Sequence, residues 1–177
     1  MKVQHWRFAK GLVALGCLLA ASVQAATVLE RVSAGGKLVI AHRESSVPFS
    51  YVDSQSGKPV GYAVDLCLRL AEVVRKKTGK KDMQVEFLAV TPANRIAMIE
   101  QGKADMECGS TTNNAERRQK VAFTVPHFIT GARLLVKAAS PIDRLEDLQG
   151  KTLASTKGTT PLKAVVQANR ERLMGIQ

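Results

Sequence analysis

Between residues 37 and 107, short apolar runs alternate with helical patterns, and this alternation limits the possible folds more than any other feature. The run 37–41 is apolar almost without a break, which is typical of a strand buried on both faces. The expected strands are 37–41, 83–90 and 104–107, and the expected helices are 62–77 and one that opens at Thr91–Pro92 and ends at Gly102. This alternating order predicts a parallel α/β sheet.

The first 25 residues have the pattern of a cleaved export signal. A positively charged start precedes an apolar run over residues 11–21, and Val23–Gln24–Ala25 matches an ordinary cleavage site. The apolar run is too short to span a bilayer. Cys17 could instead suggest a lipoprotein cleavage site, but apolar residues continue past it. We therefore expect a mature chain that starts at Ala26, works outside the cytoplasm and has the length of about one domain.

The formal net charge of +11 raises the possibility of a nucleic-acid or membrane-surface partner. The distribution of the basic residues argues against this, because they are dispersed and no aromatic residues are interleaved with them in a stacking pattern. The short basic groups are 75–77 and 80–81 at the end of an expected helix, and 117–118 in an expected turn. We therefore expect no nucleic-acid partner.

Two cysteines remain after the expected cleavage, Cys67 in an expected helix and Cys108 at the end of an expected strand. They could pair in an oxidising compartment, but the sequence does not show whether they lie within bonding distance, and two buried thiols fit it equally well. Neither has metal-ligand spacing, and the histidines are scattered at His5, His42 and His127. We expect no metal site and no cofactor.

Arginines follow the expected strands at three places. Arg43 follows the first strand, Arg95 begins the helix after the second, and the hydroxyl-rich loop 107–117 follows the third and ends in Arg117. The carboxyl ends of parallel strands meet at one edge of a sheet, where ligands bind, so we expect these arginines to share one rim. A guanidinium group matches a carboxylate through two parallel hydrogen bonds. Three such groups on one rim favour a ligand with two carboxylates.

Three motifs make these residues similar to a known family. They are His42–Arg43–Glu44–Ser45–Ser46–Val47–Pro48–Phe49–Ser50–Tyr51, Asn94–Arg95 and Glu107–Cys108–Gly109–Ser110–Thr111–Thr112–Asn113–Asn114. The chain thereby resembles the periplasmic amino-acid-binding proteins of ABC importers (bacterial extracellular solute-binding proteins, family 3), and among them the glutamate/aspartate binders. The resemblance implies a monomeric periplasmic protein that binds one amino acid and delivers it to an inner-membrane ABC permease.

The resemblance also implies an α/β fold of the periplasmic-binding-protein-like type II, a two-lobed clamshell. Residues 1–25 would be the signal peptide, 26–135 a nearly complete first lobe, and 136–177 the start of an incomplete second lobe. Past the loop 107–117, the sequence predicts further elements in this order: a strand at 133–137, a short helical segment at 142–148, a strand at 151–155 and a helix from Thr160–Pro161 to about residue 173.

Seven side chains match the ligand-binding positions of the family. The resemblance assigns Ser110 and Thr112 to the α-amino and α-carboxylate groups of the ligand, and Arg117 to the α-carboxylate. It assigns Arg43 and Arg95 to the carboxylate of the ligand's side chain. From the second lobe, Thr159 and Thr160 would close on the α-carboxylate. A helix N-terminus at this threonine pair would support that role, because its free N–H groups attract anions.

The sequence departs from the family in two ways. Pro92 stands where the glutamate/aspartate binders have a serine on the side-chain carboxylate, and proline offers neither a hydroxyl nor an N–H group. The chain also ends before the histidine and the acidic residue that complete the family's pocket from the second lobe. We therefore expect an N-terminal fragment with impaired amino-acid binding.

Two other classes of function remain as alternatives. The first is an enzyme on the same clamshell, such as a dehydratase, which would need a positioned acid or base in the cleft. The candidates at the rim are Glu44, Asp53 and Glu107, and the sequence shows no pairing among them. The second alternative is a ligand-sensing domain, which would need a membrane helix or an output module. We expect a binding protein and no enzymatic activity.

Overall fold

The computed structural model describes residues 26–177, so the expected export signal lies outside the described residues. The elements in chain order are α1 (Val28–Gly35), β1 (Lys37–His42), β2 (Ser45–Ser46), β3 (Ser50–Val52), β4 (Pro59–Val60), α2 (Tyr62–Thr78), β5 (Gln84–Ala89), α3 (Arg95–Glu100), β6 (Met106–Cys108), α4 (Ala115–Arg118), the 3-10 helix η1 (Leu145–Leu148) and α5 (Thr160–Arg172). Within this part of the chain no helix has both the length and the apolar character that a membrane span requires.

A parallel sheet in the order β5-β1-β6 forms the centre of the fold. Along β1, Ile40 pairs with Phe87 of β5 and with Met106 of β6. Leu38, Ile40 and Ala41 are completely buried, as the continuous apolar run in the sequence indicates. The predicted parallel α/β sheet is confirmed.

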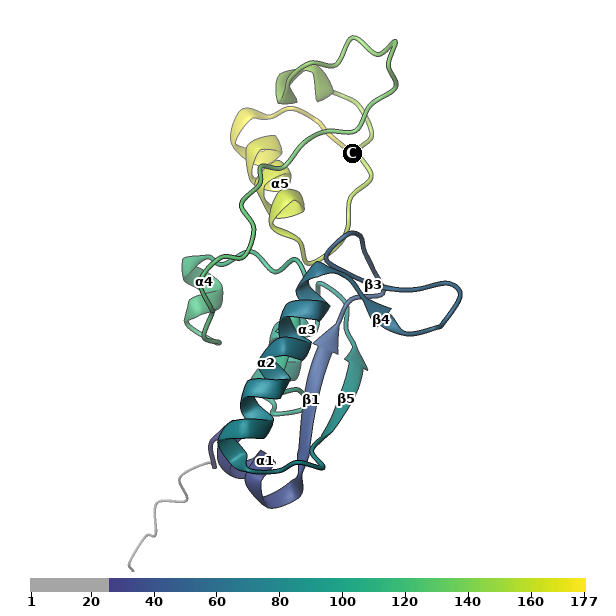
Figure 1. The fold of residues 1–177 in the computed structure, drawn as a ribbon. Helices are drawn as coiled ribbons and strands as arrows, with labels where there is room; N and C mark the ends of the chain where they lie inside the picture. The colour runs from purple at the N-terminus through teal and green to yellow at the C-terminus, as the bar shows by residue number, and fades with distance from the viewer. Residues whose placement is uncertain (1–25) are drawn as a thin grey trace, which may run out of the picture.

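Helices cover both faces of this sheet (Figure 1). Side chains of α1 and α2 pack on one face around Val32, Leu38 and Val74. On the opposite face, Met98 and Ile99 of α3 pack against a buried cluster that includes Ala41. Lysines and an arginine fill the last turn of α2, and Gly79 ends that helix in the left-handed conformation. The sheet therefore has a hydrophobic core on each of its two faces.

The helix α3 begins later than the sequence predicts. Asn94 precedes its first residue, whereas Thr91 and Pro92 lie in a turn before it. The backbone N–H of Thr91 donates to Asn94 Oδ1 (2.8 Å), and the backbone N–H of Asn94 donates to Thr91 Oγ1 (3.3 Å). These reciprocal bonds satisfy the turn locally, so the helix starts only at Arg95.

A disulfide joins Cys67 of α2 to Cys108 at the end of β6, with their Cα atoms 6.3 Å apart. This decides between the two alternatives that the sequence left open for these cysteines. The bond ties the helix on one face to the strand end that leads into the loop at Gly109. It therefore fixes the start of the loop that the sequence marks as ligand-binding.

A second, antiparallel sheet in the order β2-β3-β4 lies between β1 and α2 in the sequence. The turn into α2 brings Gly61 against Phe49, with φ at +123°. A Cβ at this position would lie 2.6 Å from the carbonyl oxygen of Phe49. Only glycine combines this backbone conformation with so close an approach.

The part of the chain after α4 differs most from the sequence prediction. Residues 133–137 and 151–155, all within the described chain, form no strand, although η1 and α5 lie where helical segments were expected. A strand requires a neighbour to receive its backbone hydrogen bonds. Leu135 is fully exposed, and around 151–155 only isolated bonds form, such as Leu153 N–H to Gln177 O at 2.8 Å. The two strand predictions are therefore wrong.

Candidate binding site

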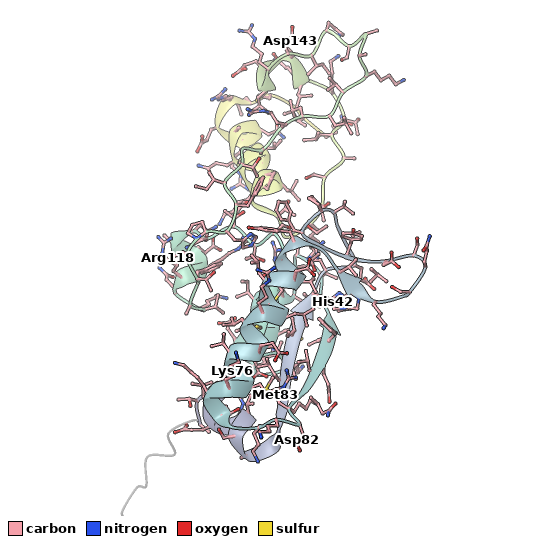
Figure 2. The ribbon with its side chains drawn as sticks, in the orientation of Figure 1. His42, Lys76, Asp82, Met83, Arg118 and Asp143 are labelled. Carbon is pink, nitrogen blue, oxygen red and sulfur yellow. A yellow bond between two sulfur atoms is a disulfide. The ribbon has the colours of Figure 1, made fainter. Side chains whose placement is uncertain are left out.

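The carboxyl ends of β1, β5 and β6 meet at one edge of the parallel sheet. His42, the last residue of β1, pairs with Ala89 of β5 and with Cys108 of β6. His42 lies at the end of the sheet that faces the C-terminal segment, and Asp82 and Met83 lie at the opposite end (Figure 2). The segments that carry Arg43, Arg95 and Arg117 follow β1, β5 and β6 in the chain, and the charges of Arg43 and Arg117 act on Arg95, as expected for a shared rim.

Arg95 is the most buried of the three arginines, with 3% of its surface exposed. Burial lowers the pKa of Arg95 to about 10; the carboxylate of Glu107 opposes this shift, and the positive charges of Arg117 and Arg43 add to it. The side chain stays charged at neutral pH. Its Nε and Nη1 atoms have no hydrogen-bond partner among the described residues. A buried cation with free donors is suited to an incoming anion.

Arg43 is held at the rim by its backbone. Its N–H donates to the Oγ of buried Ser50 at 2.9 Å, and its carbonyl oxygen lies 3.1 Å from Nδ1 of His42. Its Nε atom is buried and has no hydrogen-bond partner within residues 26–177. Arg43 and Arg95 therefore both have unsatisfied guanidinium nitrogens, and the charge of Arg43 acts on Arg95.

Glu107 contributes a carboxylate that the sequence analysis did not assign to the binding site. Its Oε1 lies 3.7 Å from Nη1 of Arg95, which is an ion-pair distance but too long for a hydrogen bond. A Cβ at Gly109 would lie 2.6 Å from that Oε1 and 3.0 Å from Cγ of Arg43. The absence of a side chain at Gly109 therefore leaves room for the Glu107 carboxylate near Arg43 and Arg95. The sequence alone does not show this arrangement.

The loop after β6 brings the predicted hydroxyl groups to the same rim. Asn114 caps α4 by accepting the backbone N–H of Arg117 at 2.9 Å. Nη1 of Arg117 donates to the carbonyl oxygen of Thr112 at 2.9 Å. The Oγ of Ser110 lies 2.7 Å from the Oγ of Ser46, which is part of the first motif but had no predicted role.

The start of α5 lies against this loop. Thr159 caps the helix by accepting the backbone N–H of Leu162, and Oγ1 of Thr160 lies 3.0 Å from Oγ1 of Thr112. Nη2 of Arg117 donates to the carbonyl oxygen of Gly158 at 3.4 Å. Arg117, Gly158, Thr159 and Thr160 line a pocket of about 370 Å³. The structure thus brings together all seven predicted site residues in two neighbouring groups, while their roles in binding stay predictions.

Gly158 lies against the backbone of the turn that precedes α3. Its φ is +82°, and a Cβ there would lie 2.7 Å from both the N and the Cα atoms of Ala93 and 2.8 Å from the carbonyl carbon of Pro92. The packing partner of Gly158 is Ala93, which lies 65 positions earlier in the chain and cannot be predicted from a local pattern. Pro92 therefore also lies against Gly158.

We expect Gly158→Ala to lift residues 156–160 from the rim while the parallel sheet stays intact. The added methyl group would overlap backbone atoms that cannot rotate away. Amide hydrogen exchange of residues 156–163 should accelerate by about tenfold or more, with β1 unchanged. Gly150→Ala is the matched control, because Gly150 also has a positive φ (+67°) but has open space around its Cα. Equal acceleration in the control would show that strain, and not the contact with Ala93, controls the segment.

The model of the family described as bacterial extracellular solute-binding proteins, family 3, matches residues 38–175. The chain belongs to this family. Two curated relatives support the assignment. The glutamate/aspartate import solute-binding protein of Salmonella typhimurium is 43% identical over 86% of this chain, and the L-glutamate/L-aspartate-binding protein of Pseudomonas aeruginosa is 39% identical over 84%. This family-3 chain spans about half the length of these relatives, 50% and 49% respectively.

Solved structures agree with the family-3 assignment. The arginine-bound form of a truncated ArgBP from T. maritima matches with a TM-score of 0.70 and 26% identity, over 83% of this chain and 65% of that one. The ancestral amino acid-binding protein AncCDT-1, described as a precursor of cyclohexadienyl dehydratase, matches with a TM-score of 0.70 and 29% identity, over 85% and 63%. The predicted type II periplasmic-binding-protein fold is confirmed.

Proposed function

We propose that the chain binds an acidic amino acid, glutamate or aspartate, in the periplasm and that the complete protein delivers it as a monomer to an ABC permease. The observation that carries this proposal is the buried side chain of Arg95, together with the buried Nε atom of Arg43, at the edge of the sheet where β1 ends. Arg43 and Arg95 have unsatisfied guanidinium nitrogens that could bind the carboxylate of the ligand's side chain. Two curated relatives named for glutamate and aspartate support the same ligand class.

The α-carboxylate would be bound on the opposite side of the cleft. Arg117 donates to the backbone carbonyl oxygens of Thr112 and Gly158, and the hydroxyl of Thr112 lies next to that of Thr160. The start of α5 adds backbone N–H groups and a positive electrostatic potential at Thr159 and Thr160. Ser110 and Thr112 would complete this subsite, and their hydroxyl oxygens would accept hydrogen bonds from the ligand's ammonium group.

We assign residues 1–25 to a signal peptide, 26–135 to the first lobe and 136–177 to part of the second lobe. In this chain Ser110 and Thr112 are exposed, so contacts made there are screened by water. An exposed ion pair contributes only about 0–1 kcal/mol. We therefore expect the chain as it stands to bind weakly, with a dissociation constant of about 1 mM.

We further infer that the chain binds its ligand without transforming it. Asp53, one of the acid–base candidates, accepts hydrogen bonds from Gln55 and Ser56 in its own turn, and these bonds lower the pKa of its carboxyl, Ser56 having the larger effect. Glu107 is paired with Arg95. Neither carboxylate is thereby placed for proton transfer, and the curated relatives are named as binding proteins.

Arg117→Ala is expected to weaken the binding of every amino acid by up to about fivefold, because it removes an exposed charge-assisted contact to the group that all of them share. NMR titration with glutamate, aspartate, glutamine and arginine, carried to tens of millimolar, can follow about this range of affinity. Arg118→Ala is the matched control, since the neighbouring Arg118 on α4 (Figure 2) donates to Asn113 and is not part of the cleft. Tighter binding of glutamine or arginine than of glutamate and aspartate would contradict the proposed ligand class.

A further inference from the structure

Glu107 lies in surroundings that are unusual for a carboxylate. It is in the middle of β6, where it pairs with Ala41 of β1. Neighbouring residues in a strand point to opposite faces, so Glu107 lies on the face opposite to its neighbour Cys108, which is bonded to α2. That is the face with the apolar cluster of Ala41, Val90 and Ala104. Its side chain is only 13% exposed.

Two arginines approach this carboxylate. Nη1 of Arg95 lies 3.7 Å from Oε1 of Glu107. A Cβ on Gly109 would lie 2.6 Å from the same Oε1 and 3.0 Å from Cγ of Arg43, so the carboxylate and the side chain of Arg43 lie close to each other. Within residues 26–177, Glu107 Oε1, Arg95 Nε and Nη1, and Arg43 Nε are all buried and have no hydrogen-bond partner. Glu107 Oε1 and Arg95 Nη1 therefore form an ion pair without a hydrogen bond that would satisfy either atom.

We propose that Glu107 is a positioning residue that sets the charge of the cleft. Its carboxylate is the counter-ion of Arg95, and it reduces the three positive charges of the arginine rim to two. The two remaining positive charges match the two carboxylates of an acidic amino acid, whose ammonium group is bound separately by Ser110 and Thr112. This inference rests on the proposed function and adds to it the residue that sets how many carboxylates the cleft accepts.

The energetic argument follows from burial. Without Glu107, Arg95 would stay buried beside Arg43 and Arg117 with no opposing charge among the groups that act on it. A buried charge that loses its partner destabilises the fold, and a free anion in solution can replace the missing carboxylate. If the Glu107 carboxylate served only for packing, its removal would not make the stability of the protein depend on added anions.

The first experiment requires no amino-acid ligand. The unfolding temperature of Glu107→Gln is measured with increasing sulfate and, at equal ionic strength, with chloride. We expect sulfate to raise it by about 4 °C or more above the rise seen for the unchanged protein. Glu86→Gln is the matched control, because it removes the same charge from an exposed carboxylate paired with Lys37. An equal sulfate response in all three proteins, or a Glu107→Gln variant that folds at no sulfate concentration, would overturn the proposal.

The second experiment tests the ligand class. The affinities for glutarate and for a tricarboxylate, tricarballylate, are compared by NMR titration in the unchanged protein, in Glu107→Gln and in Glu107→Asp. We expect the ratio to shift about tenfold toward the tricarboxylate in Glu107→Gln and to stay unchanged in Glu107→Asp, which keeps the charge. An unshifted ratio would overturn the role in ligand choice. If the unchanged protein binds neither glutamate nor aspartate in the titration described above, the proposed function is wrong, while the sulfate response still decides whether Glu107 is the counter-ion.

Discussion

Reduction of the Cys67–Cys108 disulfide is expected to lower the free energy of unfolding by about 4 kcal/mol. The bond closes a loop with a sequence separation of 41 residues, and the loss of that restraint in the unfolded chain accounts for an effect of about this size. For a chain of this length the unfolding temperature should fall by about 10 °C. Circular dichroism melts with and without a thiol reductant provide the measurement.

The double variant Cys67→Ser/Cys108→Ser separates the disulfide from other effects of the reductant. It should melt at the temperature of the reduced protein, and the reductant should not change its melting further. The bond also anchors the strand end before Gly109 and Ser110, so the loop should become more mobile in the variant. A double variant that melts like the oxidised protein would contradict the expected stabilisation.

Gly61→Ala is expected to destabilise the protein by about 3 kcal/mol or more. The backbone at Gly61 has φ +123° and ψ 167°, a region that is almost exclusive to glycine. A Cβ there would lie 2.6 and 2.7 Å from the carbonyl oxygen and carbon of Phe49, and 2.8 Å from the carbonyl oxygen of Pro48. The same carbonyls accept hydrogen bonds from the first turn of α2, at Tyr62 and Ala63. The substitution would therefore push the helix away from its anchor.

Gly57→Ala is the control for this substitution. Gly57 also has a positive φ (+66°), but no atom lies within 4 Å of the position that a Cβ would take. The control should cost only the left-handed conformation, about 1 kcal/mol. Urea denaturation of both variants measures the difference. If both variants lost the same stability, the close approach to Phe49 would have no energetic role.

The fold between β1 and β6 could be predicted because each element has its own periodic signal. The apolar run of β1 and the amphipathic pattern of α2 depend only on neighbouring residues. The predicted start of α3 at Thr91–Pro92 was wrong because Thr91 does not cap the helix. Thr91 and Asn94 are bonded to each other in a turn, and only Asn94 directly precedes the helix.

The arginine rim could also be predicted, since the direction of parallel strands determines which loops meet. Contacts that join distant segments could not. The carboxylate of Glu107 near Arg95, the approach of Gly158 to Ala93 and the disulfide all depend on distances that no local pattern contains. The wrong strand at 133–137 has the same origin, because its residues have strand character but no adjacent strand receives their hydrogen bonds.

The position of β1 between β5 and β6 has a consequence for how the chain folds. Ile40 finds its partners Phe87 and Met106 only after long stretches of intervening chain have been synthesised. Bringing such distant residues together costs loop entropy before the contacts stabilise the structure, which slows folding. During that interval the most apolar strand remains unpaired and open to aggregation or to a chaperone. The central strand β1 is thus synthesised before its neighbours β5 and β6, and its pairing is complete only after both have been synthesised.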